Sequence, residues 1–268
     1  MTDTAYRVNG LLLGLAAGDK IGGPLHMALC LAESLQYRQN FDRADIQARY
    51  LAWWQAGGFD TGPTAAKIFT LAKNGSPWEE SVEQVDRLLG GYTAGCNPAH
   101  RAAPLAMAHF LPDAHLAAHA EAEARLTHKH PLAGDVAAAV VLLCRALIRG
   151  VAWDEACLTA AQGRHPETRD ALKRHNADTI DPGGYAPEVF RAALHFLDGF
   201  ETFSEALHHS VDFAGPSNYC PVLVGSIGGA RWGTAVIAPE DYRHHEALMP
   251  QLRKLSEALA RDWEATTS

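Results

Sequence analysis

The residues with the clearest chemical potential lie in a glycine-rich break, where positions 57–64 read GGFDTGPT. The carboxylate of Asp60 could act as a base, bind a metal ion or cap the helix predicted at 65–73. Pro63 fits the first turn of such a helix, because the N–H that it lacks has no helical partner there. From this motif alone, a site residue and a helix cap both remain open for Asp60.

Four more polar side chains lie where the helical pattern breaks. His128 and His130 are spaced i, i+2, which is not a helical metal spacing, so they favour fixing a loop or lining a cleft over binding zinc. Asn97 precedes a proline and is either a turn residue or part of a site. His26 closely follows a Gly-Pro pair; its imidazole could serve as a base or a ligand, although a lone His at such a position is more often structural.

The cysteines are scattered and never spaced as C-x-x-C, which indicates small buried residues in a reducing compartment. A catalytic thiol is the weaker interpretation, and it would fit Cys96 or Cys220 best because both lie in loop-like stretches. The full set is Cys30, Cys96, Cys144, Cys157 and Cys220.

The composition is that of a globular protein, with 268 residues, 47% hydrophobic and 20% charged. A formal net charge of −8 gives no basic surface, so we expect no nucleic-acid partner. The first apolar run is interrupted by Asp19 and Lys20 after about ten positions, too few to cross a bilayer. The N-terminus has no secretory pattern, and we expect a cytoplasmic protein without a membrane partner.

Helical periodicity dominates the chain, and no convincing alternating run predicts a strand. Helices are expected at 7–17, 27–37, 43–55, 65–73, 81–89, 99–110, 116–125, 132–149, 151–161, 166–175, 187–196, 203–211, 222–232 and 239–265. Ser76 and Pro77 are expected to begin the fifth of them as cap and first residue. No repeat or linker divides the sequence, which predicts one all-α domain over 1–268.

Two helices carry further information. Gly10, Gly14 and Gly18 recur at every fourth position, which places them on one face where a second helix can approach closely. The helix at 132–149 is apolar almost all round and is therefore expected at the centre.

Three stretches together resemble the ADP-ribosylglycohydrolase family. They are the opening 7–24 (RVNGLLLGLAAGDKIGGP), the central segments 58–64, 94–107 (AGCNPAHRAAPLAM) and 127–133 (THKHPLA), and the closing 210–233 (SVDFAGPSNYCPVLVGSIGGARWG). No single stretch is specific to the family. Their occurrence together in the same order, over roughly 7–233, is specific. The resemblance implies a compact orthogonal helical bundle.

In that family two magnesium ions hold the ribose hydroxyls of an ADP-ribosyl group and position the attacking water. The aspartates come from a T-D-D-T loop and a D-x-D-T loop. Here the first loop keeps only Asp60, and the second reads Pro216-Ser217-Asn218-Tyr219 at 216–219, without an aspartate. His26 replaces a glutamate. The resemblance therefore implies that Mg²⁺ binding is weak or absent, with at most a single ion at Asp60.

The resemblance also implies roles for particular residues. Asp60 would be the catalytic base or the single metal ligand. The residues expected to bind substrate are His26, Thr61, Asn97, His128, Asn218 and Tyr219. The function implied is hydrolysis of an N- or O-glycosidic bond of an ADP-ribosyl or related ribosyl group. The alternative is an inactive relative that binds ADP-ribose or an ADP-ribosylated protein.

Overall fold

The computed structural model describes residues 3–173 and 180–263, and within these ranges the only β feature is an isolated antiparallel bridge between Gly95 and Tyr185. The helices are, in chain order, α1 (Asp3–Gly18), α2 (Gly23–Arg38), α3 (Arg43–Gln55), α4 (Gly62–Lys73), α5 (Trp78–Leu88), α6 (Asn97–Arg101), α7 (Pro104–Met107), α8 (Asp113–Ala124), α9 (Pro131–Ile148), α10 (Trp153–Ala161), α11 (Pro166–Ala171), α12 (Ala186–Gly199), α13 (Phe203–Ala214), α14 (Cys220–Trp232), α15 (Pro239–Tyr242) and α16 (Met249–Ala260). The prediction of an all-α bundle is confirmed.

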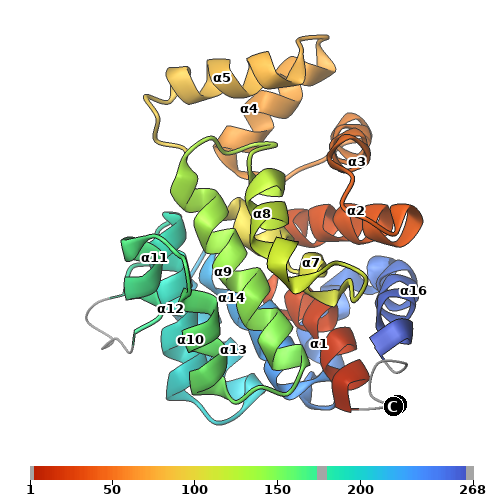
Figure 1. The fold of residues 1–268 in the computed structure, drawn as a ribbon, viewed down its shortest axis with the longest axis vertical. Helices are drawn as coiled ribbons and strands as arrows, with labels where there is room; N and C mark the ends of the chain where they lie inside the picture. Colours follow the sequence, from red (N-terminus) through yellow and green to blue (C-terminus); the bar gives the residue numbers. More distant parts are fainter. Residues whose placement is uncertain (1–2, 174–179, 264–268) are drawn as a thin grey trace.

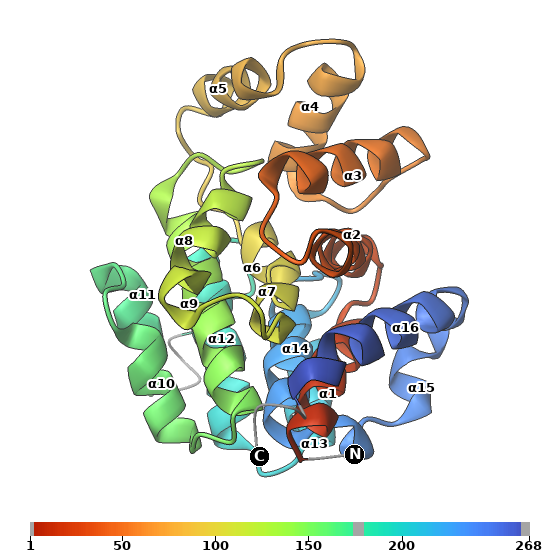
Figure 2. The same ribbon diagram turned by 45° about the vertical axis from the view of Figure 1, so that its right-hand side comes forward.

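Helices α1 and α14 form the tightest pair in the protein and run antiparallel side by side (Figures 1 and 2). A Cβ on Gly14 would lie 2.1 Å from the carbonyl oxygen of Gly225, and one on Gly10 would lie 2.3 Å from that of Gly229. The two backbones therefore touch, as the glycine spacing of α1 predicts. Their register brings the C-terminal end of α1 next to the N-terminal end of α14.

Helix α9 is the central element, in agreement with the sequence (Figure 1). It packs against α8, α10, α6 and α14. Its mean hydropathy of 1.9 over 18 residues would suffice for a membrane span, but 83% of that window is buried inside the protein. The helix is apolar because it is surrounded by other helices.

Helices α4 and α5 lie at one end of the molecule, outside the body formed by the other helices (Figure 1). Helix α5 begins at Trp78, with Pro77 as its N-cap in an extended conformation and no side-chain cap bond. The expected start at Ser76 and Pro77 is therefore wrong by one residue. The Pro77 carbonyl oxygen accepts from the N–H and the hydroxyl of Ser81, so the first turn closes on the proline itself.

Several predicted boundaries differ from the observed ones. The segment 99–110 splits into α6 and α7, because Pro104 has no N–H to continue the first helix. The segment 239–265 divides into α15, a 3-10 turn at Arg243–Leu248, α16 and a 3-10 turn at Arg261–Trp263. The segment 166–175 is helical to Ala171, and its last two positions lie outside the described residues.

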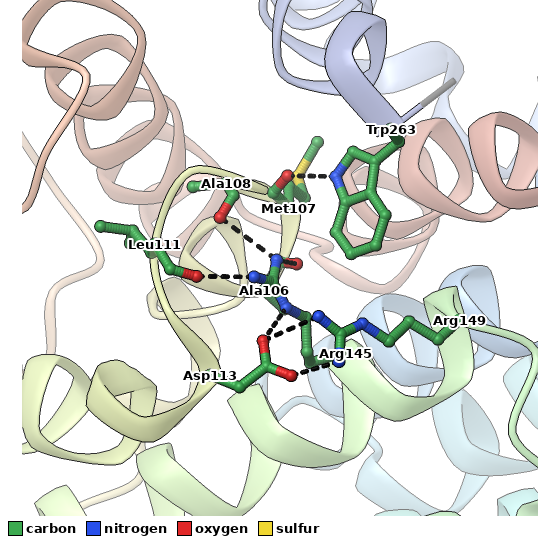
Figure 3. A network of polar contacts seen from close by, with 8 residues as sticks. All are labelled: Ala106, Met107, Ala108, Leu111, Asp113, Arg145, Arg149 and Trp263. Atoms are coloured by element: carbon green, nitrogen blue, oxygen red, sulfur yellow. Dashed lines mark hydrogen bonds and ion pairs between the residues drawn. The ribbon is translucent and has the colours of Figure 1, made fainter. Parts of the chain in front are cut away.

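Arg145 of α9 fastens the irregular chain between α7 and α8 (Figure 3). Its guanidinium donates to three backbone carbonyl oxygens, those of Ala106, Ala108 and Leu111. The same group pairs with Asp113 at 2.9 Å and lies over the ring of Trp263. The buried guanidinium thus donates hydrogen bonds to carbonyl oxygens that lack a backbone N–H partner within a helix.

Candidate active site

The side chains of Asp19, Asp60 and Asn218 meet at one junction. The Nδ2 amide nitrogen of Asn218 donates to Asp19 Oδ1 at 2.7 Å and to Asp60 Oδ2 at 3.0 Å. Asp19 follows α1, Asp60 precedes α4, and Asn218 precedes α14. Asp60 and Asn218, which the sequence predicts as site residues, are therefore in direct contact.

The orientation of the Asn218 amide is fixed by its partners. Its Oδ1 accepts from the backbone N–H of Lys20 at 2.9 Å, and an N–H can only donate. Rotating the amide by 180° would place Nδ2 against that N–H and Oδ1 against two carboxylates. The NH₂ group therefore faces Asp19 and Asp60.

Asp19 is wholly buried and caps the start of α2. Its carboxylate accepts from the backbone N–H groups of Ile21 (3.2 Å), Gly22 (2.8 Å) and Leu25 (2.8 Å). Its carbonyl oxygen contacts the Nε2 atoms of His244 and His245. Asp19 is not among the site residues predicted from the sequence, although an acidic side chain shortly before a Gly-Gly-Pro helix start was an available signal.

Asp60 does not cap α4, because that helix has Thr61 as its N-cap, without a side-chain cap bond. Its backbone has the unusual φ of 49°, and its carbonyl oxygen would lie 2.2 Å from a Cβ on Gly23. Partial burial and the nearby charge of Asp19 raise the pKa of the Asp60 carboxyl, against the hydrogen bond from Asn218. A half-buried carboxyl with a raised pKa is suited to accept a proton.

Three of the other predicted residues border this junction. The Asn97 side chain lies against Gly62, where a Cβ would come within 2.9 Å of its Oδ1. Thr61 is buried directly beside Asp60. The Tyr219 ring packs on Gly184 and is half-buried.

His26 lies on the other side of Asp60 in an aromatic cluster with Trp53 and Phe59. Its ring stacks on Trp53 and meets Phe59 edge-on, each with ring centroids 5.6 Å apart. Burial and the neighbouring His245 lower the pKa of His26, against the attraction of Asp19. A neutral imidazole is therefore expected here at pH 7.

His128 is buried, with only 2% of it exposed, and its Nε2 would lie 3.1 Å from a Cβ on Gly95. Its Nδ1 lies 2.8 Å from the hydroxyl oxygen of Thr127. The same oxygen accepts a hydrogen bond from the guanidinium of Arg101. Arg101 in turn pairs with the buried Glu123 at 2.6 Å. The segment THKHPLA thus ties the loop before α9 to α6 and α8. His130, by contrast, accepts from the N–H of Leu132 as the N-cap of α9.

The N-termini of α2, α4, α6, α12 and α14 converge around the junction. Gly62 of α4 lies against Asn97 of α6, and Gly184 before α12 lies against Tyr219 before α14. The Cys96 N–H donates to the Gly184 carbonyl oxygen at 3.1 Å, which ties α6 to α12. The N-cap residues of α4, α12 and α14 make no side-chain cap bond. Such helix ends attract anions, phosphates above all.

Neither candidate thiol is exposed in this region. Burial raises the pKa of Cys96 and of Cys220, and both are under 3% exposed. A thiol held protonated is a poor nucleophile, so the geometry argues against a catalytic cysteine.

The ADP-ribosylglycohydrolase family model matches residues 25–267 of the chain. The chain belongs to the ADP-ribosylglycohydrolase family. It is 24% identical over 212 residues to the ADP-ribosyl-(dinitrogen reductase) glycohydrolase of Rhodospirillum rubrum, covering 77% of this chain and 67% of that protein. It is 23% identical over 297 aligned positions to the ADP-ribosylarginine hydrolase Tri1 of Pseudomonas putida (strain GB-1), covering 94% and 77%.

A solved structure described as an ADP-ribosylglycohydrolase-related protein complex has the same fold. The match has a TM-score of 0.76 at 26% identity and covers 97% of this chain and 99% of the other. The helical bundle is therefore that of ADP-ribosylglycohydrolases, and the junction lies at loops that the family resemblance had already assigned to its site.

The residues at the junction do not fit the binuclear magnesium pair that the family resemblance implies. The Asn218 NH₂ group points at both carboxylates, and its oxygen is turned away to Lys20. The Asp19 oxygens already accept from three backbone N–H groups. In the described part of the chain, no group of three or more His, Cys, Asp or Glu residues could hold a metal ion.

Proposed function

We propose that this chain binds an ADP-ribosyl group at the junction of Asp19, Asp60 and Asn218 and hydrolyses its glycosidic bond without a binuclear magnesium pair. One observation carries the proposal: Asn218 holds the half-buried Asp60 carboxylate where several helix N-termini converge. Membership of the ADP-ribosylglycohydrolase family supports the reaction class.

In this proposal Asp60 acts as the general base. Its carboxylate takes a proton from a water molecule whose oxygen forms a bond to the anomeric carbon of the ribose. The bond from that carbon to the acceptor nitrogen or oxygen breaks, and the acceptor leaves with its electron pair and takes up a proton from solvent, while Asp60 later returns its proton to solvent. The raised pKa of the Asp60 carboxyl, caused by its partial burial, strengthens it as a base.

The surroundings of Asp60 supply the binding groups for the rest of the ligand. The positive ends of the α4 and α14 helix dipoles, where the N-cap residues make no side-chain cap bond, would attract the two phosphates. The ring of Tyr219, and that of Tyr185, which is 40% exposed, are available to stack on adenine or ribose. Asn97 is placed to donate to or accept from a ribose hydroxyl.

A binding protein without catalysis is the second candidate. The observation that favours it is the Asn218 NH₂ group, which occupies space between the two carboxylates and offers no substitute for a cation that activates water. Such a protein would recognise ADP-ribose or an ADP-ribosylated protein through the same surface.

One experiment separates these functions. Calorimetric titration with ADP-ribose, with and without magnesium, measures binding, and release of ADP-ribose from an ADP-ribosylated arginine peptide measures hydrolysis. We expect binding and release in both buffers. Binding without release would establish the second candidate, and the absence of binding would refute both.

The Asp60→Asn variant tests the role of the base. We expect its rate of hydrolysis to fall by about 10²–10⁴-fold, because a general base contributes that much. Binding of ADP-ribose should change far less. Asp212→Asn, at an exposed position of α13, is the matched control and should behave as the unmodified protein. Equal rates in the two variants would remove Asp60 from the mechanism.

A further inference from the structure

Two like charges lie close together at the junction, and one neutral group separates them. The Asp19 and Asp60 oxygens both lie within 3.0 Å of the Asn218 Nδ2 atom. The Asp19 charge contributes to the raised pKa of Asp60, so the two carboxylates do repel. Folding holds them together nonetheless, and α1, α4 and α14 converge on this contact.

The geometry of the amide resembles that of a cation between two ligands. Its two N–H bonds diverge by about 120° and present a partial positive charge to each carboxylate. The N–O distances of 2.7 and 3.0 Å exceed the 2.3–2.6 Å of calcium ligands by only a few tenths of an ångström. The 2.0–2.1 Å of magnesium ligands would require a larger contraction.

We propose that the Asn218 amide takes the place of a divalent cation between Asp19 and Asp60, so that the junction is complete without metal and a single change, Asn218→Asp, makes the fold cation-dependent. The proposal concerns how the junction is held together. It therefore stands or falls separately from the proposed hydrolysis.

The Asn218→Asp substitution removes two of the three side-chain hydrogen bonds of this residue and keeps the third. The remaining oxygen still accepts from the Lys20 N–H. The two donations are lost, and a third carboxylate enters where the NH₂ group was. Three carboxylates in contact repel one another unless a cation or a proton joins them. We therefore expect a lower melting temperature without added cation.

Calcium chloride and magnesium chloride are the probes, and thermal unfolding after EDTA treatment is the measurement. For Asn218→Asp we expect the melting temperature to rise by about 3 °C for each tenfold excess of calcium over its dissociation constant, with a smaller response to magnesium. The unmodified protein should not respond to either cation. A rise in the unmodified protein equal to that of the variant would overturn the proposal.

Two controls separate bridging from mere packing. Asn218→Ala removes the amide without adding charge, and it should be destabilised but insensitive to cations. Asn40→Asp adds the same charge at an exposed position beyond the C-terminal end of α2, the opposite end of that helix from the junction, and should also be insensitive. If Asn218→Asp is no more cation-sensitive than these controls, the amide does not stand in for a cation.

A second measurement keeps the test valid if Asn218→Asp does not fold. In the unmodified protein the two side-chain amide protons of Asn218 should exchange slowly with solvent, because both are hydrogen-bonded. Their NMR signals should not move when calcium or magnesium is added to 10-fold molar excess. Fast exchange, or a shift that saturates with cation, would show that the amide does not occupy this place.

Discussion

At the scale of single residues, two buried histidines make stability depend on pH. Burial lowers the pKa of His100 to about 4 and that of His128 to about 3. Both rings are therefore neutral in the folded protein at pH 7. In the unfolded chain each would take up a proton near pH 6.5.

We predict that stability falls on acidification below pH 6.5. There the unfolded state binds more protons than the folded state, so each histidine costs about 1.4 kcal/mol per pH unit, down to about pH 4 for His100 and about pH 3 for His128. Above pH 6.5 neither contributes a slope. Urea midpoints at pH 7.5, 6 and 5 measure this effect. The His100→Met variant should show a shallower decline, whereas His209→Gln, at an exposed position, should not.

Residue chemistry was partly predictable from the sequence. Asp60 and Asn218 were assigned to one site because the order of the family's stretches could be matched in this chain. Asp19 was missed because its role depends on backbone N–H groups and on a partner 199 positions away. The placement of His128 below the surface could not be inferred, since its neighbours come from α6 and α8.

At the scale of elements, the α1 and α14 pair is sensitive to one methyl group. In an exposed helix Gly→Ala stabilises by about 1 kcal/mol. Gly14→Ala should instead destabilise by about 1–3 kcal/mol or more, because the new Cβ would lie 2.1 Å from the Gly225 carbonyl oxygen and the helices must separate. The control is Gly199→Ala in α12, where nothing lies within 4 Å. Comparable urea midpoints for the two variants would contradict this account.

Arg145 of α9 and Arg149, the C-cap of that helix, contact the same carboxylate and should differ in their contribution to stability. Arg145→Leu leaves three carbonyl oxygens without their donor, and we expect a loss on the order of 3 kcal/mol. Arg149 also pairs with Asp113, but 48% of its side chain is exposed. Arg149→Leu should therefore cost at most about 1 kcal/mol. Chemical denaturation of both variants measures the difference directly.

Helix positions followed from periodicity, whereas helix ends did not. The apolar run of α9 and the glycine face of α1 were sufficient to predict a central helix and a close helix pair. The break between α6 and α7 was missed, because the alanines around Pro104 continue the helical pattern without interruption. The carbonyls freed there are satisfied by Arg145, more than 30 positions along the chain.

At the scale of the whole molecule, the all-α class was predictable but the meeting of five helix N-termini was not. Each start is visible in the sequence as a proline, glycine or polar residue before an apolar run. Which starts converge depends on how the helices pack. The packing register of α1 against α14 places the start of α14 next to the end of α1. The bridge between Gly95 and Tyr185 places the start of α12 next to the start of α6.

The pairing of α1 with α14 also determines when, during synthesis of the chain, the site can form. At about 5–20 residues per second, a ribosome needs on the order of 10–40 s to add the 199 positions that separate Asp19 from Asn218. During that interval the glycine face of α1 has no partner, and Asp19 has neither Asn218 nor the histidines near position 245. A nascent or truncated chain that ends before α14 can hold most of the helices and still lack the site. The activity proposed for this protein would therefore begin only once α14 has been synthesised.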